Sequence, residues 1–150
     1  MDTVLEDIAN HLEFFGYTIE KKERKESANN FNYYASHERY NNIRFFEIYK
    51  NYVCFQICFW LDGLTMDTSA LAETFNEFNR KSILAKFYYT LDKDGSRVFV
   101  YAEAIFIGDY TKQSFGLFYD RFKVDEKDAF ESDSYKNCFV TKEEATCMVQ

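Results

Sequence analysis

The chain has 150 residues, a length that usually forms one core, with 18 basic and 25 acidic side chains and a net charge of −7. Because nucleic-acid binding by counterion release needs clustered lysine and arginine, this balance disfavours a general nucleic-acid-binding protein. Aromatic residues make up 20% of the chain and proline is absent, which argues against disorder and predicts some rings on a partly exposed face.

The N-terminus and the apolar runs predict a cytoplasmic protein that does not contact a membrane. Asp2, Glu6 and Asp7 stand where a signal peptide would carry basic residues. The longest apolar run, at 53–61, is interrupted by Gln56 and is far shorter than the about 20 residues of a spanning helix.

The cysteines do not follow the spacing of a metal site. Cys54 and Cys58 lie four residues apart in a strand-like run, so their Cα atoms would be separated by about 13 Å. That separation is too large for one zinc ion or one disulfide. We expect buried, reduced thiols, and neither a metal nor a cofactor.

The first 36 residues predict a helix and two short strands. An apolar stripe at helical spacing runs through 2–15, with Asp2 or Thr3 as the cap and Gly16 as the stop. A short strand at 17–20 then precedes a solvated charged loop that contains the KKERK run. Residues 31–36 are a weak strand.

Two antiparallel hairpins follow, with a helix between them. Strands at 43–49 and 52–61 flank a two-residue turn, and a helix capped by Asp67 or Thr68 ends near Asn79. The second hairpin joins 84–91 to 97–106 through a turn that contains Gly95.

Residue alternation predicts that the sheet is covered by helices on one side only. In the last strand Val98, Val100 and Ala102 share one face, and small side chains there leave room for a helix. The reverse face carries aromatic rings suited to contact with another chain. The predicted partner-binding residues are Trp60, Tyr88, Phe99 and Tyr101.

The last predicted helix is capped by Asp109 and carries Phe115, Phe118 and Phe122 on one stripe. Gly116 inside it either permits close packing or marks a bend. The tail at 131–150 is less periodic, and either adds a short strand at about 138–141 or remains loose.

The order of elements indicates an α+β fold, an antiparallel sheet covered by helices in the order α-β-β-β-α-β-β-α. We expect a single domain at 1–130 and a partly ordered C-terminal extension at 131–150.

A short segment after the second helix resembles the YbjN-like family. The pattern is Asn-x-x-Asn-Arg, then Ser-x-x-Ala-Lys-Phe, then Asp-Gly in a turn. Its members here are Asn76, Asn79, Arg80, Ser82, Ala85, Lys86, Phe87, Asp94 and Gly95. Family members are described as candidate regulators of bacterial sensory transduction, with a fold similar to that of type III secretion chaperones.

The resemblance spans about residues 4–125 in element order, but only about 30 residues are specific. It implies a compact α+β module that often self-associates and binds protein rather than turning over a substrate. It lends no catalytic residues.

Asn76 and Asn79 invite a structural interpretation and a ligand-binding one. They lie three residues apart on one helix face, near its C-terminal end. There an asparagine can adopt a left-handed conformation, bond the last carbonyls, or tie the helix to the following strand. We favour the structural interpretation for this pair and for Arg80.

Enzymatic chemistry finds little support in the sequence. Only His11 and His37 could act as a histidine base, and neither lies near a nucleophile motif. Phosphate-binding glycine loops are absent from the sequence. Lys86 and Arg97 beside the sheet rings would suit RNA, but Glu103 on the same face counts against it.

Three functional hypotheses therefore remain. The first is a non-enzymatic cytoplasmic regulatory module that binds a protein partner through its aromatic sheet face, as a homodimer. The second is a small acidic inhibitor of a defence or nucleic-acid-binding factor. The third is an enzyme, which would need His11 or His37 beside a nucleophile or carboxylate.

Overall fold

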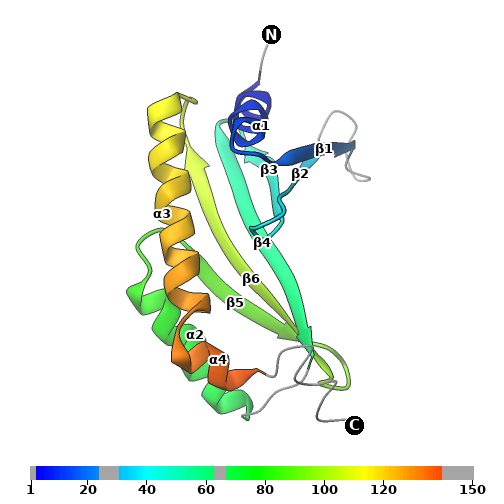
Figure 1. Cartoon of the computed structure of the whole chain (residues 1–150), viewed down its shortest axis with the longest axis vertical. Helices are drawn as coiled ribbons and strands as arrows, with labels where there is room; N and C mark the ends of the chain where they lie inside the picture. The colour runs from blue at the N-terminus through cyan, green and yellow to red at the C-terminus, as the bar shows by residue number, and fades with distance from the viewer. Residues whose placement is uncertain (1–2, 24–30, 63–66, 140–150) are drawn as a thin grey trace. The chain divides into compact units, whose positions relative to one another are not determined.

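The computed structural model describes residues 3–23, 31–62 and 67–139, which form an α+β fold (Figure 1). The predicted fold class and order of elements are confirmed, with four strands between the first two helices and a short helix after the third. The elements are α1 (Val4–Phe14), β1 (Thr18–Glu23), β2 (Phe31–Ser36), β3 (Ile43–Tyr49), β4 (Tyr52–Asp62), α2 (Thr68–Lys81), β5 (Lys86–Leu91), β6 (Arg97–Ile107), α3 (Lys112–Phe130) and α4 (Asp133–Cys138).

The six strands form one antiparallel sheet in the order β1-β2-β3-β4-β6-β5. The chain divides into two compact units. Unit 1 comprises Met1–Cys58 and Glu103–Asp120, and unit 2 comprises Phe59–Ala102 and Arg121–Gln150. Because β4, β6 and α3 each contribute to both units, the predicted single domain at 1–130 with an extension stays a prediction.

Unit 1 packs α1 against its strands around a chain of aromatic rings. Pairing places Tyr33 opposite Phe45, and Phe45 opposite Phe55, so that the three rings stack across neighbouring strands. Phe115 of α3 meets the Phe55 ring edge-on at a centroid distance of 5.6 Å. Ile8 and Leu12 of α1 are fully buried. The apolar stripe of α1 is therefore the face that packs into the core of unit 1.

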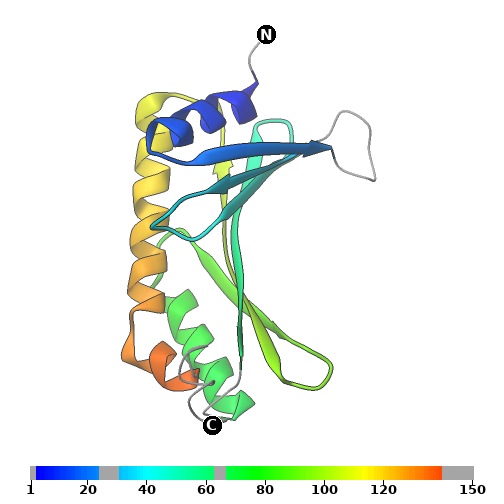
Figure 2. The same ribbon diagram turned by 45° about the vertical axis from the view of Figure 1, so that its right-hand side comes forward.

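Unit 2 is built around Phe78 of α2. Its ring lies 5.6 Å from that of Phe87 on β5 and 6.1 Å from that of Tyr135 on α4. Figure 2 shows α2 and α4 side by side in this unit. Val98 and Val100 of β6 are fully buried, as their small side chains predicted. This face of the unit 2 strands is thus covered by helices.

The helix ends agree with the sequence in two cases and differ in one. Thr3 caps α1 and Asp67 caps α2 through side-chain bonds to backbone N–H groups. The prediction of Asp109 as the cap of α3 is wrong. Thr111 takes that role, because the Ser114 N–H donates to Thr111 Oγ1 at 2.9 Å and the Thr111 N–H donates back to Ser114 Oγ at 3.0 Å.

Two further expectations need correction. The predicted loop begins too early, since β1 continues to Glu23. Its lysines cover rings of β2: Lys21 Nζ lies 4.1 Å from the Phe31 ring centroid. A strand near 138–141 is also wrong at Cys138, which ends helix α4 and packs its thiol 3.5 Å from Thr74 Oγ1. Residues 140–150 lie outside the described part of the chain.

Among the described helices, none is long and apolar enough to cross a membrane.

Candidate functional site

Trp60, Tyr88, Phe99 and Tyr101, which we call the outer aromatic patch, all lie on unit 2 strands. They alternate with residues of the covered face, so they point to the opposite side of the sheet. Trp60 is 43% exposed, and the other three are half-buried. The structure therefore places all four predicted binding residues on one partly exposed surface of unit 2.

Ring contacts make this patch an ordered surface. Tyr88 of β5 and Tyr101 of β6 stack with centroids 4.6 Å apart and planes 8° from parallel. Such a cross-strand pair contributes about 0.5–1.5 kcal/mol beyond the area it buries. Arg97 places its guanidinium carbon 4.7 Å from the Trp60 ring centroid and its Nε 3.9 Å from Asp62 Oδ1. Three of the four rings are thus held in place by contacts within the chain.

Asn79 ties helix α2 to strand β5, as the structural interpretation predicted. Its Nδ2 donates to the Phe87 carbonyl at 2.9 Å, and its Oδ1 accepts from the Phe87 N–H at 2.7 Å. The left-handed conformation that we considered is wrong, since Asn79 lies within the helix. Asn76 is exposed, and within the described chain its side chain makes no corresponding bond. Arg80 pairs with Glu77 on the helix surface.

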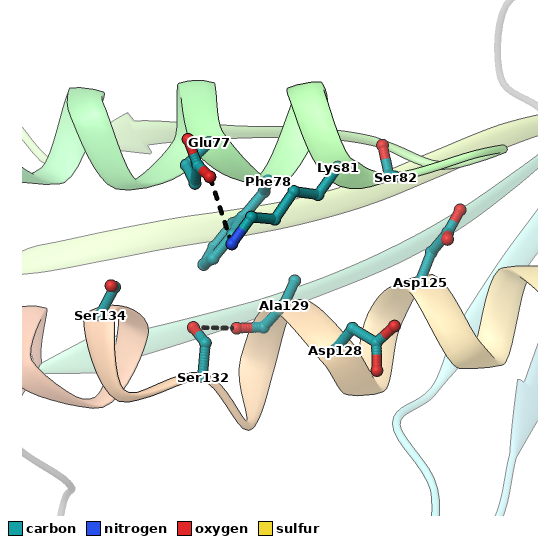
Figure 3. A pocket seen from close by; sticks show the side chains of 9 residues that line it. All are labelled: Glu77, Phe78, Lys81, Ser82, Asp125, Asp128, Ala129, Ser132 and Ser134. Carbon is teal, nitrogen blue, oxygen red and sulfur yellow. Dashed lines mark hydrogen bonds and ion pairs between the residues drawn. The ribbon is translucent and has the colours of Figure 1, made fainter.

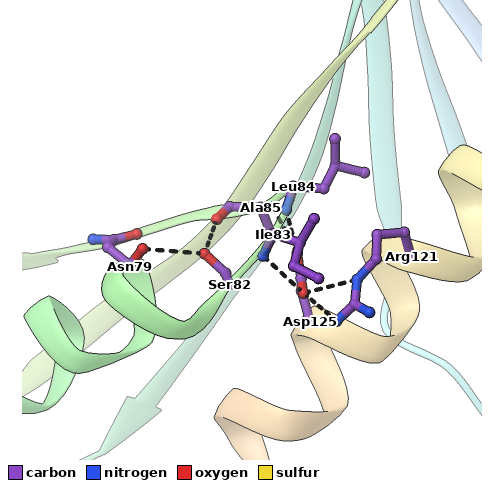
Figure 4. A network of polar contacts seen from close by, with 7 residues as sticks. All are labelled: Asn79, Ser82, Ile83, Leu84, Ala85, Arg121 and Asp125. Carbon is purple, nitrogen blue, oxygen red and sulfur yellow. Dashed lines mark hydrogen bonds and ion pairs between the residues drawn. The ribbon is translucent and has the colours of Figure 1, made fainter.

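Asp125 of α3 organises the connection between α2 and β5, and the sequence reasoning missed it (Figure 4). Its carboxylate is 1% exposed. It accepts N–H bonds from Ile83 at 3.2 Å, Leu84 at 2.7 Å and Ala85 at 2.8 Å, and two from the Arg121 guanidinium. These bonds satisfy backbone donors that follow the helix end.

The charge of Asp125 is stabilised by these donors. Burial alone would raise the pKa of the carboxyl group. The N–H groups of Ala85 and Leu84, together with Arg121, outweigh burial, so the pKa lies below its usual value. A sequence signal existed: Asp125 follows Phe118 and Phe122 on the buried stripe of α3, where a charged residue needs partners.

A pocket of about 380 Å³ opens in unit 2 beside this network (Figure 3). Glu77 and Lys81 of α2 and Asp125 and Asp128 of α3 supply its charges. Lys81 Nζ lies 3.2 Å from Glu77 Oε1, and Ser132 Oγ donates to the Ala129 carbonyl at 2.7 Å. Most of its polar lining is therefore already engaged within the protein.

In unit 1, three side chains on the corresponding side of the sheet are polar and bond one another. Arg44 Nη2 donates to Gln56 Oε1 at 2.7 Å, and Gln56 Nε2 donates to Glu103 Oε2 at 3.3 Å. Cys54 is buried beside them. Burial, and next the Glu103 carboxylate, raises the pKa of its thiol to about 12. This thiol is therefore a poor nucleophile at neutral pH.

The two histidines contact groups of different kinds. His11 Nδ1 lies 2.8 Å from the Tyr110 hydroxyl, and burial, followed by the nearby Lys112 ammonium, lowers the His11 pKa. His37 Nε2 lies 3.2 Å from the Phe15 carbonyl, and its Nδ1 accepts from the Arg39 N–H. Within the described ranges, no group of three or more His, Cys, Asp or Glu residues is arranged to hold a metal ion.

Comparison with known proteins identifies the fold and does not identify an activity. No protein-family model matches the chain. No curated protein matches it either. Among solved structures, YbjN from E. coli, described as a candidate transcription regulator, is similar with a TM-score of 0.60 and 12% identity, over 91% of this chain and 95% of that one.

An uncharacterized protein from Methanothermobacter thermautotrophicus is similar with a TM-score of 0.55 and 12% identity, over 85% of this chain and 94% of that one. At such low identity these matches concern the fold alone. The chain has a YbjN-like fold, as the Asn-x-x-Asn-Arg segment and its context predicted.

Proposed function

We propose that the protein is a non-enzymatic regulatory module of the cytoplasm that binds a protein partner through the outer aromatic patch. One observation carries this proposal: the rings of the patch are partly exposed, while Val98, Val100 and Ala102 on the opposite side of β6 are fully buried. Burial of such rings against a second chain is favourable, because it removes apolar surface from water.

The composition of the patch favours a protein as the partner. Interface centres are enriched in tryptophan, tyrosine and arginine, and Trp60, Tyr101 and Arg97 are of these types. The net charge of −7 disfavours a polyanion such as RNA on the same rings. Likeness to YbjN, itself described as a candidate transcription regulator, is consistent with a regulatory role.

We further propose that one partner is a second copy of the chain. Light scattering after size-exclusion chromatography would measure the mass of the wild-type protein and of the double variant Trp60→Ser, Tyr101→Ser. We expect a dimer for the wild type and a folded monomer for the variant. The matched control is Phe14→Ser, which removes an 88% exposed ring from α1.

A photo-crosslinking amino acid at position 99 would identify other partners in the native cell. We expect crosslinks at that position and fewer at an exposed control position, Lys127. A wild-type chain that remains monomeric at high concentration, together with an absence of crosslinks from position 99, would contradict the proposal.

A further inference from the structure

A second pocket, of about 450 Å³, lies in unit 1 where α1, the loop at 108–111 and the first turns of α3 meet. Phe14 and Phe15 of α1 and Tyr110 of the loop line it with aromatic rings. Phe14 is 88% exposed and Phe15 44% exposed, so the core of the unit leaves both rings accessible. A pocket of this size and lining suits a small molecule with an apolar body.

Gly116 lies in the wall of this pocket, in the second turn of α3. A Cβ atom added there would meet no heavy atom within 4 Å, so packing inside the chain does not require glycine. Its backbone is ordinary helix, so no positive φ angle requires glycine either. Glycine destabilises a helix relative to alanine. The space in front of Gly116 is therefore open to a group from outside the chain.

The polar groups of the pocket are few and convergent. His11 and Tyr110 hold each other through the 2.8 Å contact between Nδ1 and the hydroxyl. Burial raises the pKa of Tyr110, as does the carboxylate of Asp7, so the phenol is neutral. Asn10 adds an amide. The pocket thus offers neutral hydrogen-bonding groups beside its rings.

Two opposite charges complete the lining, and they suggest the ligand. Asp7 of α1 and Lys112 of α3 both border the pocket. Among the described residues, neither side chain takes part in an ion pair. A ligand that carries both an ammonium and a carboxylate group would complement both charges at once.

We infer that this pocket binds a free α-amino acid with an aromatic side chain. The ammonium group of the ligand lies toward Asp7, its carboxylate toward Lys112, and its ring against Phe14 and Phe15 in the space that Gly116 leaves open. The site is independent of the outer aromatic patch, and binding here involves no covalent step.

Nuclear magnetic resonance of the full-length, ¹⁵N-labelled protein tests the site directly. L-phenylalanine would be titrated into the millimolar range. We expect the Gly116 amide signal to shift in a saturable manner while that of Gly95, in the β5–β6 turn, stays unchanged. 3-Phenylpropionate lacks the ammonium group and phenethylamine lacks the carboxylate, so each should bind at least about tenfold more weakly.

Variants separate the contributions of shape and charge. Gly116→Leu should fill the space and abolish the shift, while Lys112→Met and Asp7→Asn should each weaken binding by about tenfold. Lys127→Met is the matched control on the same helix and should leave binding unchanged. If Gly116→Leu fails to fold, the two charge variants still decide.

Three results would each overturn the inference. One is the absence of any saturable shift at Gly116. Another is equal binding of all three compounds, which would indicate an apolar surface without selection for a zwitterion. The last is undiminished binding in both Lys112→Met and Asp7→Asn.

Discussion

The two units differ in the strand side chains that point away from the helices. In unit 1, Arg44, Gln56 and Glu103 form a hydrogen-bonded row. In unit 2, Trp60, Tyr88 and Tyr101 present partly exposed rings. Although Arg44 Nε is buried without a hydrogen-bond partner among the described residues, polar groups that already bond one another gain less from a partner than ring surface gains from further burial. The comparison therefore supports the proposal that a partner would bind unit 2.

The comparison requires unit 2 to be stabilised by interactions outside the outer aromatic patch, and among these Asp125 should have the largest effect. Asp125→Ala leaves three N–H groups and Arg121 without their acceptor, so we expect a loss of about 3–5 kcal/mol in the free energy of unfolding. Urea denaturation would measure it. Asp128→Asn on the exposed side of the same helix is the control, and a loss there of equal size would contradict the role of Asp125.

The pH dependence of this stabilisation has a defined sign. The pKa of Asp125 is lowered in the folded state, so its contribution is present above the ordinary aspartate pKa of 3.8 and is lost as the pH falls toward the lower folded-state pKa. We expect the difference in unfolding free energy between wild type and Asp125→Ala to shrink below about pH 4.

The reactivity of Cys54 tests the hydrogen-bonded row of Arg44, Gln56 and Glu103 in unit 1, which lies beside it. Because the pKa of its thiol is raised from 9.0 to about 12, its thiolate fraction at pH 8 is about a thousandfold lower than that of an ordinary thiol. We expect very slow labelling of Cys54 by a thiol reagent and fast labelling of the exposed Cys58. Glu103→Gln should accelerate labelling of Cys54. Mass spectrometry of the labelled peptides would assign each rate.

Asn79 gives a smaller effect, for which the chain contains a matched control. Asn79→Ala removes two bonds to the Phe87 backbone, and we expect a loss of about 1–2 kcal/mol in the free energy of unfolding. Asn76→Ala, on the same helix, should be neutral or slightly stabilising, because alanine is the better helix former. Equal losses in both variants would indicate a general effect on the stability of α2. They would contradict the role of the bonds between Asn79 and Phe87.

The outer aromatic patch should have the smallest effect on folding. Trp60→Ser should change the free energy of unfolding by about 1 kcal/mol or less, because its ring is 43% exposed. Thermal unfolding monitored by circular dichroism would show this. A much larger loss would mean that the ring serves the core of unit 2, and the contrast between the units would disappear.

Local patterns predicted most of the architecture. Alternation along β6 separated buried Val98 and Val100 from Phe99 and Tyr101, because the side chains of a strand point to opposite faces. Thr3 and Asp67 were each one of the two cap candidates that the sequence offered for their helix, and such caps can be recognised because their bonds reach only three residues. Such interactions lie within the reach of a sequence window.

What the sequence did not predict depends on distant segments. The backbone N–H partners of Asp125 lie about 40 residues earlier in the chain, so spacing alone could not find them. Asn76 and Asn79 look alike in sequence, yet only Asn79 meets β5. The pocket at Gly116 requires α1 to lie near α3, about 100 residues away. Tertiary pairing, rather than local propensity, decides all three.

Asn79 also affects the free edge of the sheet. Strand β5 is the last in the sheet, and the terminal strand of any sheet is a template on which foreign chains can polymerise. A side-chain amide has the same kinds of donor and acceptor as a peptide unit. At Phe87 the Asn79 amide makes the two hydrogen bonds that a neighbouring strand would otherwise make. Because Asn79 occupies the N–H and the carbonyl of Phe87, these two groups of the edge strand are not free to pair with a foreign chain.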